Sequence, residues 1–111
     1  MKIYLINQIN TNKYKIGVTK NNVSLRVKQL QTGSSESLTT ITEFETNYGF
    51  KLESILHRHY DCKKTIGEWF ELSEQDITTF LKTCETYENN FKIIEEQNTY
   101  YQDKVSKQRK S

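Results

Sequence analysis

The first third of the chain carries the residues best suited to binding phosphate. Residues 1–35 of this 111-residue sequence contain six basic side chains and no acidic one, whereas residues 36–100 contain six basic and thirteen acidic side chains. A Lys or Arg that contacts a nucleic-acid phosphate releases a counterion, so an acid-free segment suits a phosphate-facing surface. Because the pI near 8.5 is below that of strongly basic nucleic-acid-binding domains, an ordinary solvated surface remains the alternative.

Histidine and cysteine supply further candidates for chemistry. Glu53 and His57 have the i, i+4 spacing of one helix face, where the pair serves either proton transfer or helix stability. His57, His59 and Cys62 form an H-x-H-x-x-C run, but a helix directs the two histidines differently and no fourth ligand is evident, so zinc is not expected. Cys62 and Cys84 lack a CxxC arrangement and are expected to be reduced, with Cys84 a small core residue.

A β-hairpin is predicted at the start of the sequence. Residues 3–9 place apolar side chains on both faces, as in a strand that is covered on both sides. Residues 13–19 alternate apolar and polar side chains, and Asn10, Thr11 and Asn12 favour a turn between the two segments. These segments are therefore expected to pair as antiparallel strands.

Periodicity and turn residues predict the elements that follow the hairpin. They are a helix over residues 22–32 that ends at Gly33, a strand with a bulge over 38–46, a helix over 49–60, a short strand over 68–72 and a last helix that begins at Ser73. No internal repeat or proline marks a boundary. We expect one mixed α/β domain over residues 1–97 in the order β, β, α, β, α, β, α, followed by a polar, basic tail over residues 98–111.

Four anchors in the sequence resemble those of the GIY-YIG nucleases. Residues 2–4 (Lys-Ile-Tyr) and 15–17 (Lys-Ile-Gly) resemble the paired motif, Arg26 follows on the first predicted helix, and Glu68 lies in a Gly-Glu-Trp-Phe segment. The small phage-type and fungal, meiotically-up-regulated-gene-like branch is similar in the stretches Tyr-Lys-Ile-Gly-Val-Thr-Lys-Asn, Arg-x-x-x-Leu-Gln-Thr-Gly-Ser, Glu-x-x-Leu-His and Gly-Glu-Trp-Phe-Glu-Leu. Lys2 replaces the first glycine, and Lys15 stands where the second motif has its tyrosine.

The resemblance implies a domain with a central antiparallel three-stranded sheet flanked by helices, and a metal-dependent endonuclease activity on DNA, favoured over RNA. Glu68 would hold one Mg²⁺ or Mn²⁺, Arg26 would face the phosphate, and Tyr4 would take the proton from the attacking water. Lys15 would add positive charge near Tyr4, and His57 is a second candidate for proton transfer. Four neighbouring residues are expected to bind the nucleic acid: Lys13, Tyr14, Lys20 and Lys28.

The register of the hairpin decides whether Tyr4 and Lys15 can act together. Directly opposed strand residues share a face, so these two side chains lie on one side only when paired residue numbers have an odd sum, such as 21 or 23. A four-residue loop over residues 10–13 gives 23, whereas a three-residue loop over 10–12 gives 22 and separates them.

Two other functions remain open from the sequence. One is a catalytically silent nucleic-acid-binding adaptor, and the other is a small phage-type inhibitor that binds a protein through the acidic helical half. Sequence-specific cutting by so small a domain would need a homodimer or a protein partner. The sequence has neither an apolar run near roughly 18 residues nor a basic start before an apolar stretch, so we expect an unprocessed cytoplasmic protein without membrane contact.

Overall fold

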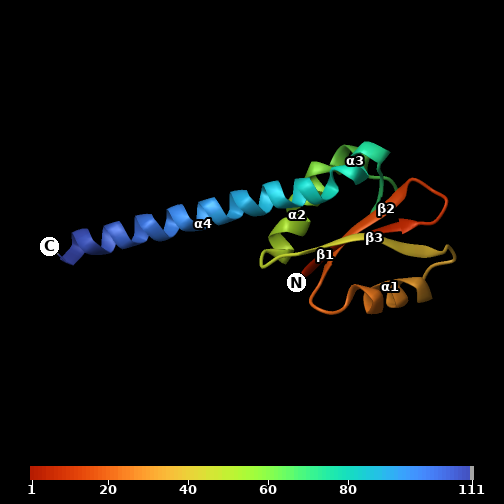
Figure 1. Ribbon diagram of the computed structural model, residues 1–111, viewed down its shortest axis with the longest axis horizontal. Coiled ribbons are helices and arrows are strands. Elements are labelled where there is room, and N and C mark those ends of the chain that lie inside the picture. The colour runs from red at the N-terminus through yellow and green to blue at the C-terminus, as the bar shows by residue number, and fades with distance from the viewer. Residues whose placement is uncertain (111) are drawn as a thin grey trace.

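Among the described residues, four antiparallel strands form a sheet with helices against both faces (Figure 1). The computed structural model describes residues 1–110, with side chains for residues 1–97. The strands are β1 (Lys2–Gln8), β2 (Lys13–Thr19), β3 (Leu38–Glu45) and β4 (Trp69–Glu71). The helices are α1 (Val23–Thr32), α2 (Gly49–His59), the 3-10 helix η1 (Asp61–Lys63), α3 (Glu74–Thr78) and α4 (Phe80–Lys110).

The strand order is β3-β1-β2-β4, which corrects the predicted three-stranded sheet. The fourth strand, β4, pairs with the outer edge of β2, where Lys13 lies opposite Glu71 and Lys15 lies opposite Trp69. A three-residue strand is too short for its pattern to indicate which edge it joins. The predicted order of elements also changes, because the single helix predicted after β4 is two helices, α3 and α4.

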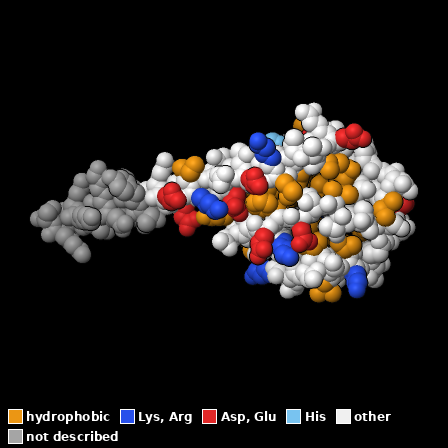
Figure 2. Space-filling view, in the orientation of Figure 1, with side chains coloured by type: hydrophobic (Ala, Val, Ile, Leu, Met, Phe, Trp, Pro, Cys, Tyr) orange, Lys and Arg blue, Asp and Glu red, His pale blue; other side chains and the backbone are white. Residues whose placement is uncertain are grey.

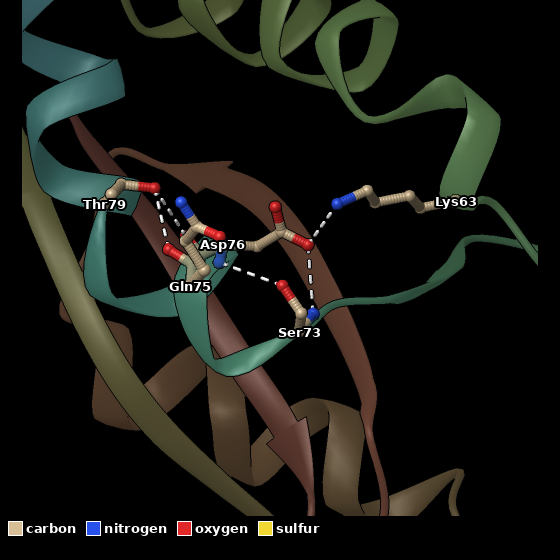
Figure 3. Close-up of polar contacts among 5 residues, drawn as sticks. All are labelled: Lys63, Ser73, Gln75, Asp76 and Thr79. Carbon is tan, nitrogen blue, oxygen red and sulfur yellow. Dashed lines mark hydrogen bonds and ion pairs between the residues drawn. The ribbon is translucent and has the colours of Figure 1, made fainter.

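The break between α3 and α4 falls at Thr79 (Figure 3). The Ser73 hydroxyl accepts a hydrogen bond from the Asp76 amide at 3.2 Å, and the Asp76 carboxylate accepts one from the Ser73 amide at 2.9 Å, a capping box that confirms the predicted helix start. Burial acts to raise the pKa of Asp76, but its ion pair with Lys63 and these hydrogen bonds hold it below the ordinary value. At the C-terminal end of α3, the Thr79 amide and hydroxyl both donate to the Gln75 carbonyl, at 3.0 and 2.8 Å.

The hairpin register has the odd sum that places Tyr4 and Lys15 on one face of the sheet. Lys15 lies opposite Ile6, and Tyr4 lies opposite Gly17, so paired numbers sum to 21. Of the two loop lengths left open by the sequence, the connection between β1 and β2 has the four-residue length, and it occupies residues 9–12 rather than 10–13. Asn10 has a φ of 66°, a left-handed conformation that asparagine tolerates in turns.

The two faces of the sheet carry separate cores. The larger core packs α2 and the start of α4 on one face, and its buried members include Ile3, Leu5, Ile16, Leu52, Leu56, Phe70, Phe80 and Cys84. The smaller core packs α1 on the other face, and its buried members are Tyr4, Ile6 and Val23. Complete burial of Cys84 confirms its predicted place in the core. The predicted bulge in β3 is also confirmed, because the pairing with β1 skips Ile41.

Helix α4 begins on the body of the protein and extends away from it to Lys110 (Figure 1). The predicted boundary between the domain and a polar, basic tail depends on residues 98–111, whose side chains lie outside the described residues, so it stays a prediction. In the described part of the chain, no helix is both long enough and apolar enough to cross a membrane.

Charge that is segregated along the sequence is mixed on the surface. On the face shown in Figure 2, acidic and basic side chains lie next to one another. Two ion pairs connect the basic first third to acidic residues further along the chain, Lys2–Glu43 at 3.2 Å and Lys15–Glu68 at 2.7 Å. The acid-free segment therefore does not stay free of carboxylates in three dimensions.

Candidate active site

Tyr4 and Gly17 make a close contact at the centre of the hairpin. They are directly opposed in the β1–β2 register. A Cβ atom built on Gly17 would lie 2.2 Å from the Tyr4 hydroxyl oxygen and 2.3 Å from the ring carbon Cζ. The Tyr4 ring therefore lies across the backbone of residue 17, in a space that only glycine leaves open, and the side chain is buried there.

Helix α1 brings Arg26 to the Tyr4 hydroxyl. The apolar stripe of α1 packs on the same face of the sheet as Tyr4, and Arg26 lies at the border of this stripe as predicted. Its Nε lies 3.4 Å from the Tyr4 hydroxyl oxygen, and its Nη1 lies 3.4 Å from Oε1 of Gln29. The contact with Tyr4 raises the pKa of Arg26, so the guanidinium remains cationic at any working pH.

Lys15 and Glu68 form the second pair of the site. The Lys15 ammonium lies 2.7 Å from Oε2 of Glu68, and the Lys15 side chain is 18% exposed whereas that of Glu68 is 71% exposed. The bond to Lys15 is the largest of the effects that lower the pKa of Glu68, and the charges of His57 and Lys64 add to it. Glu68 also raises the pKa of Arg26, so the two pairs lie within electrostatic reach of each other.

A tight loop ahead of β4 presents Glu68. Both the amide and the hydroxyl of Thr65 donate to the Trp69 carbonyl, at 2.8 and 3.0 Å, and close the loop across its base. Gly67 has a φ of 71°, a backbone conformation in which a residue with a side chain would be strained. Glu68 comes directly after this turn and before β4 begins, although the predicted strand over residues 68–72 included it, so strand alternation does not force it onto the same side as Phe70.

His57 belongs to α2, on the opposite face of the sheet from Tyr4, and holds a structural bond, although its charge still reaches Glu68. Its Nε2 lies 2.8 Å from the Ile16 carbonyl oxygen, and its ring packs edge-on against Phe70 with centroids 5.4 Å apart. A carbonyl only accepts, so Nε2 carries the proton and Nδ1 is the nitrogen left to accept or be protonated. No bond between Glu53 and His57 occurs among the described residues, and His59 instead contacts a tyrosine of α4.

The four residues predicted to bind nucleic acid do not gather at one place. Lys13 lies on the same strand and the same face as Lys15, two residues away, and is exposed. Lys20 and Lys28 are exposed, the first after β2 and the second on the outer side of α1. Tyr14 is buried in the larger core on the opposite face, where burial raises its pKa, so the structure does not bring it to the cluster.

Sequence reasoning missed Trp69 and Gln29. Trp69 is half-buried and lies opposite Lys15 in the β2–β4 register, on the α1 face of the sheet. Both residues line a cleft of about 460 Å³ that also includes Lys15. Strand alternation carried the signal for Trp69, because Phe70 and Leu72 face the larger core and their neighbour must face the other way.

The donor set at the cluster suits one loosely held Mg²⁺. Glu68 is a largely exposed carboxylate, with Oε2 beside Lys15 and no described partner for Oε1. No group of three or more His, Cys, Asp or Glu that could enclose a metal occurs among the described residues. Mg²⁺ retains several waters and is commonly held by one or two carboxylates together with a substrate phosphate, so a single carboxylate fits such an ion.

Comparison with protein families gives a match over most of the chain. The T5orf172 domain family matches residues 1–85, a range that contains all four strands and the cluster of Tyr4, Lys15, Arg26 and Glu68. No curated protein and no solved structure matches the chain.

Proposed function

Because the chain belongs to the T5orf172 family, we propose that it is a metal-dependent endonuclease that hydrolyses phosphodiester bonds in DNA. The family is associated with phage-type and homing-endonuclease-like proteins. The resemblance of the segments around Tyr4, Gly17, Arg26 and Glu68 to GIY-YIG nucleases supports the same assignment.

The observation that carries the proposal is the convergence of four side chains from three separate elements and a loop. Tyr4 of β1, Lys15 of β2, Arg26 of α1 and Glu68 of the loop before β4 form two contacting pairs on one face of the sheet. A phenol, an ammonium, a guanidinium and a carboxylate together supply what phosphodiester hydrolysis needs: a proton acceptor, charge neutralisation on the phosphate and a metal ligand.

In this proposal Arg26 binds the scissile phosphate. Its planar fork suits the geometry of phosphate oxygens, and it is held at the border of the apolar stripe of α1. Arg26 also covers the hydroxyl of Tyr4, which is otherwise buried. A guanidinium that turns toward phosphate therefore opens the Tyr4 hydroxyl to water, so that substrate binding and exposure of the proton acceptor are coupled.

Lys15 and Glu68 keep opposite charges at the other end of the cluster. Glu68 would hold the metal ion, which when bound supplies Lewis-acid stabilisation of the phosphate and the leaving oxygen. Lys15 is mostly enclosed and lies on the same face of the sheet as Tyr4, where its charge favours a bound phosphate. His57 orients the β2 edge through the Ile16 carbonyl and is a positioning residue in this scheme.

The test is cleavage of supercoiled plasmid in Mg²⁺ or Mn²⁺ against EDTA. We expect metal-dependent nicking or linearisation that falls by at least about 100-fold in Glu68→Gln and in Arg26→Ala, the range seen when one charge-stabilising group is lost. The matched controls are Glu71→Gln, an exposed glutamate of β4, and Arg58→Ala, an exposed arginine of α2, and both should cut normally.

Other outcomes identify the rival functions. A salt-sensitive gel shift of DNA without any cutting would favour an adaptor. The absence of both cutting and binding would overturn the proposal and favour a protein partner. Equal cutting by the wild type and Glu68→Gln would show that the activity comes from another site or from a contaminating nuclease.

A further inference from the structure

A cleft borders the cluster on the α1 face of the sheet. Its walls come from the end of β1, the C-terminal end of α1, the loop over residues 33–36 and the start of β4. Lys15 lines the cleft and also pairs with Glu68, so the cleft and the cluster share this residue and are adjacent. A group bound in the cleft would therefore be a near neighbour of a phosphate held by the cluster.

The loop that forms one wall is fixed before any ligand binds. The Gln31 side chain donates from Nε2 to the Glu36 carbonyl at 2.8 Å and accepts at Oε1 from the Leu38 amide at 2.8 Å. The Ser34 hydroxyl accepts from the Glu36 amide at 3.2 Å and donates to the Glu36 carbonyl at 3.1 Å. A wall held in this way loses little conformational freedom on binding, which favours a specific ligand.

The electrostatics of the cleft disfavour a phosphate inside it. Glu36 lines the cleft, and α1 directs its C-terminal end, the negative end of the helix dipole, toward the same place. Lys15, the cation in this lining, is already paired with Glu68. Two amide side chains, Gln8 and Gln29, and the half-buried ring of Trp69 also line the cleft, together with small and apolar residues. Such a lining suits a flat, neutral group that carries hydrogen-bond donors and acceptors.

We infer that this cleft takes an unstacked nucleobase of DNA next to the scissile phosphate, with its face on Trp69 and its edge toward Gln8 and Gln29. This inference rests on the proposed nuclease function. A base inside a duplex is stacked on both sides, so the cleft is open to a base from a single strand or from an unpaired position. The preferred substrate is therefore single-stranded or locally unpaired DNA.

Trp69 is the only tryptophan in the chain, so intrinsic tryptophan fluorescence reports on this cleft alone. The experiment titrates the full chain in EDTA, which prevents cutting, with a labelled single-stranded oligonucleotide and with an abasic oligonucleotide of the same length. Label anisotropy measures binding, and Trp69 fluorescence measures stacking. We expect both to bind through their phosphates, but only the oligonucleotide with bases to quench Trp69.

Variants test the side chains that read the base. Trp69→Ala should weaken binding of the single strand by about 5- to 150-fold, whereas Trp69→Phe, which retains a stacking ring, should weaken it less. Gln8→Ala should cost about 2- to 10-fold, and the matched control Gln75→Ala, an exposed glutamine of α3, should cost nothing. Circular dichroism confirms folding of each variant.

The outcomes separate this inference from the proposed function. Binding of the single strand without quenching of Trp69, or equal quenching by the abasic oligonucleotide, would overturn the nucleobase cleft even if plasmid cleavage in Mg²⁺ is intact. Tighter binding of fully paired duplex than of the single strand would overturn it as well. Absence of both binding and plasmid cleavage would instead refute the nuclease proposal on which the inference rests.

Discussion

Replacement of Gly17 by alanine tests how closely the fold and the candidate site depend on each other. The added Cβ would lie 2.2 Å from the Tyr4 hydroxyl oxygen and 2.7 Å from its Cε1, so the aromatic ring must move. Over-packing of this kind costs about 1–3 kcal/mol. Removal of a glycine from the unfolded chain offsets about 0.4–1 kcal/mol. We expect a net loss of about 1–2 kcal/mol.

Unfolding in urea, followed by circular dichroism, measures this change in Gly17→Ala. The matched control is Gly33→Ala, because a Cβ at Gly33 meets only the Leu30 carbonyl oxygen, at 3.9 Å, and should be tolerated. The loss of cleavage activity should be larger than the fraction of unfolded protein alone would cause, because displacement of the Tyr4 ring also separates its hydroxyl from Arg26. Folded Gly17→Ala should therefore retain less than about a tenth of wild-type activity, in line with removal of a positioned group.

A double-mutant cycle decides whether the Tyr4 ring is the cause. In a Tyr4→Ala background the space above residue 17 is free, so Gly17→Ala should cost little or become stabilising. The two substitutions should show a coupling of at least about 1 kcal/mol. The same cost for Gly17→Ala in both backgrounds, or equal behaviour of Gly17→Ala and Gly33→Ala, would refute the reasoning.

Three further predictions follow from contacts in the structure. Asp76→Asn should lose about 0.5–2 kcal/mol at pH 7, the range for a helix cap. The pKa of folded Asp76 is lowered, so its carboxylate contributes to the free energy of unfolding at pH values above the unfolded pKa of about 3.9. Urea unfolding at several pH values should show this contribution disappear as the pH falls through the folded pKa. Thiol titration of the native chain should modify exposed Cys62 and spare Cys84, since burial raises the pKa of Cys84 to about 12; reaction of both at equal rates would contradict this burial. His57→Ala should cost about 1–3 kcal/mol, since it leaves the Ile16 carbonyl unpaired, and His57→Gln should restore part of it; equal losses would argue against the bond.

The hairpin illustrates what the sequence could and could not predict. Apolar and polar patterning predicted both strands. Because β1 is buried on both faces, however, its pattern does not indicate which face packs against α1 and which against α2. Paired residue numbers that sum to 21 or to 23 are both odd, so either register places Tyr4 and Lys15 on the same face of the sheet. The observed four-residue loop over residues 9–12 therefore places Tyr4 and Lys15 on one side, as the four-residue alternative over 10–13 would also have done.

The candidate site was predictable only in its residue types and order. Tyr4, Lys15, Arg26 and Glu68 lie together because of long-range pairing, which periodicity does not report. The position of Glu68 depends on the turn at Gly67, outside the strand alternation used to place it. The break at Thr79 could not be predicted from periodicity, because the apolar stripe of the predicted last helix runs through it without interruption.

The bulge in β3 also bears on how the protein behaves in concentrated solution. β3 is the outer strand of the sheet, and the skipped residue Ile41 interrupts the straight row of amide and carbonyl groups along its free edge. β3 also carries charged side chains, the exposed Glu45 and Glu43, the second of which is paired with Lys2, and charged side chains on an edge strand disfavour pairing with the edge of a second copy. At the opposite edge, β4 offers only three residues for pairing. Both edges thus limit growth of the sheet, and the protein should resist strand-mediated aggregation.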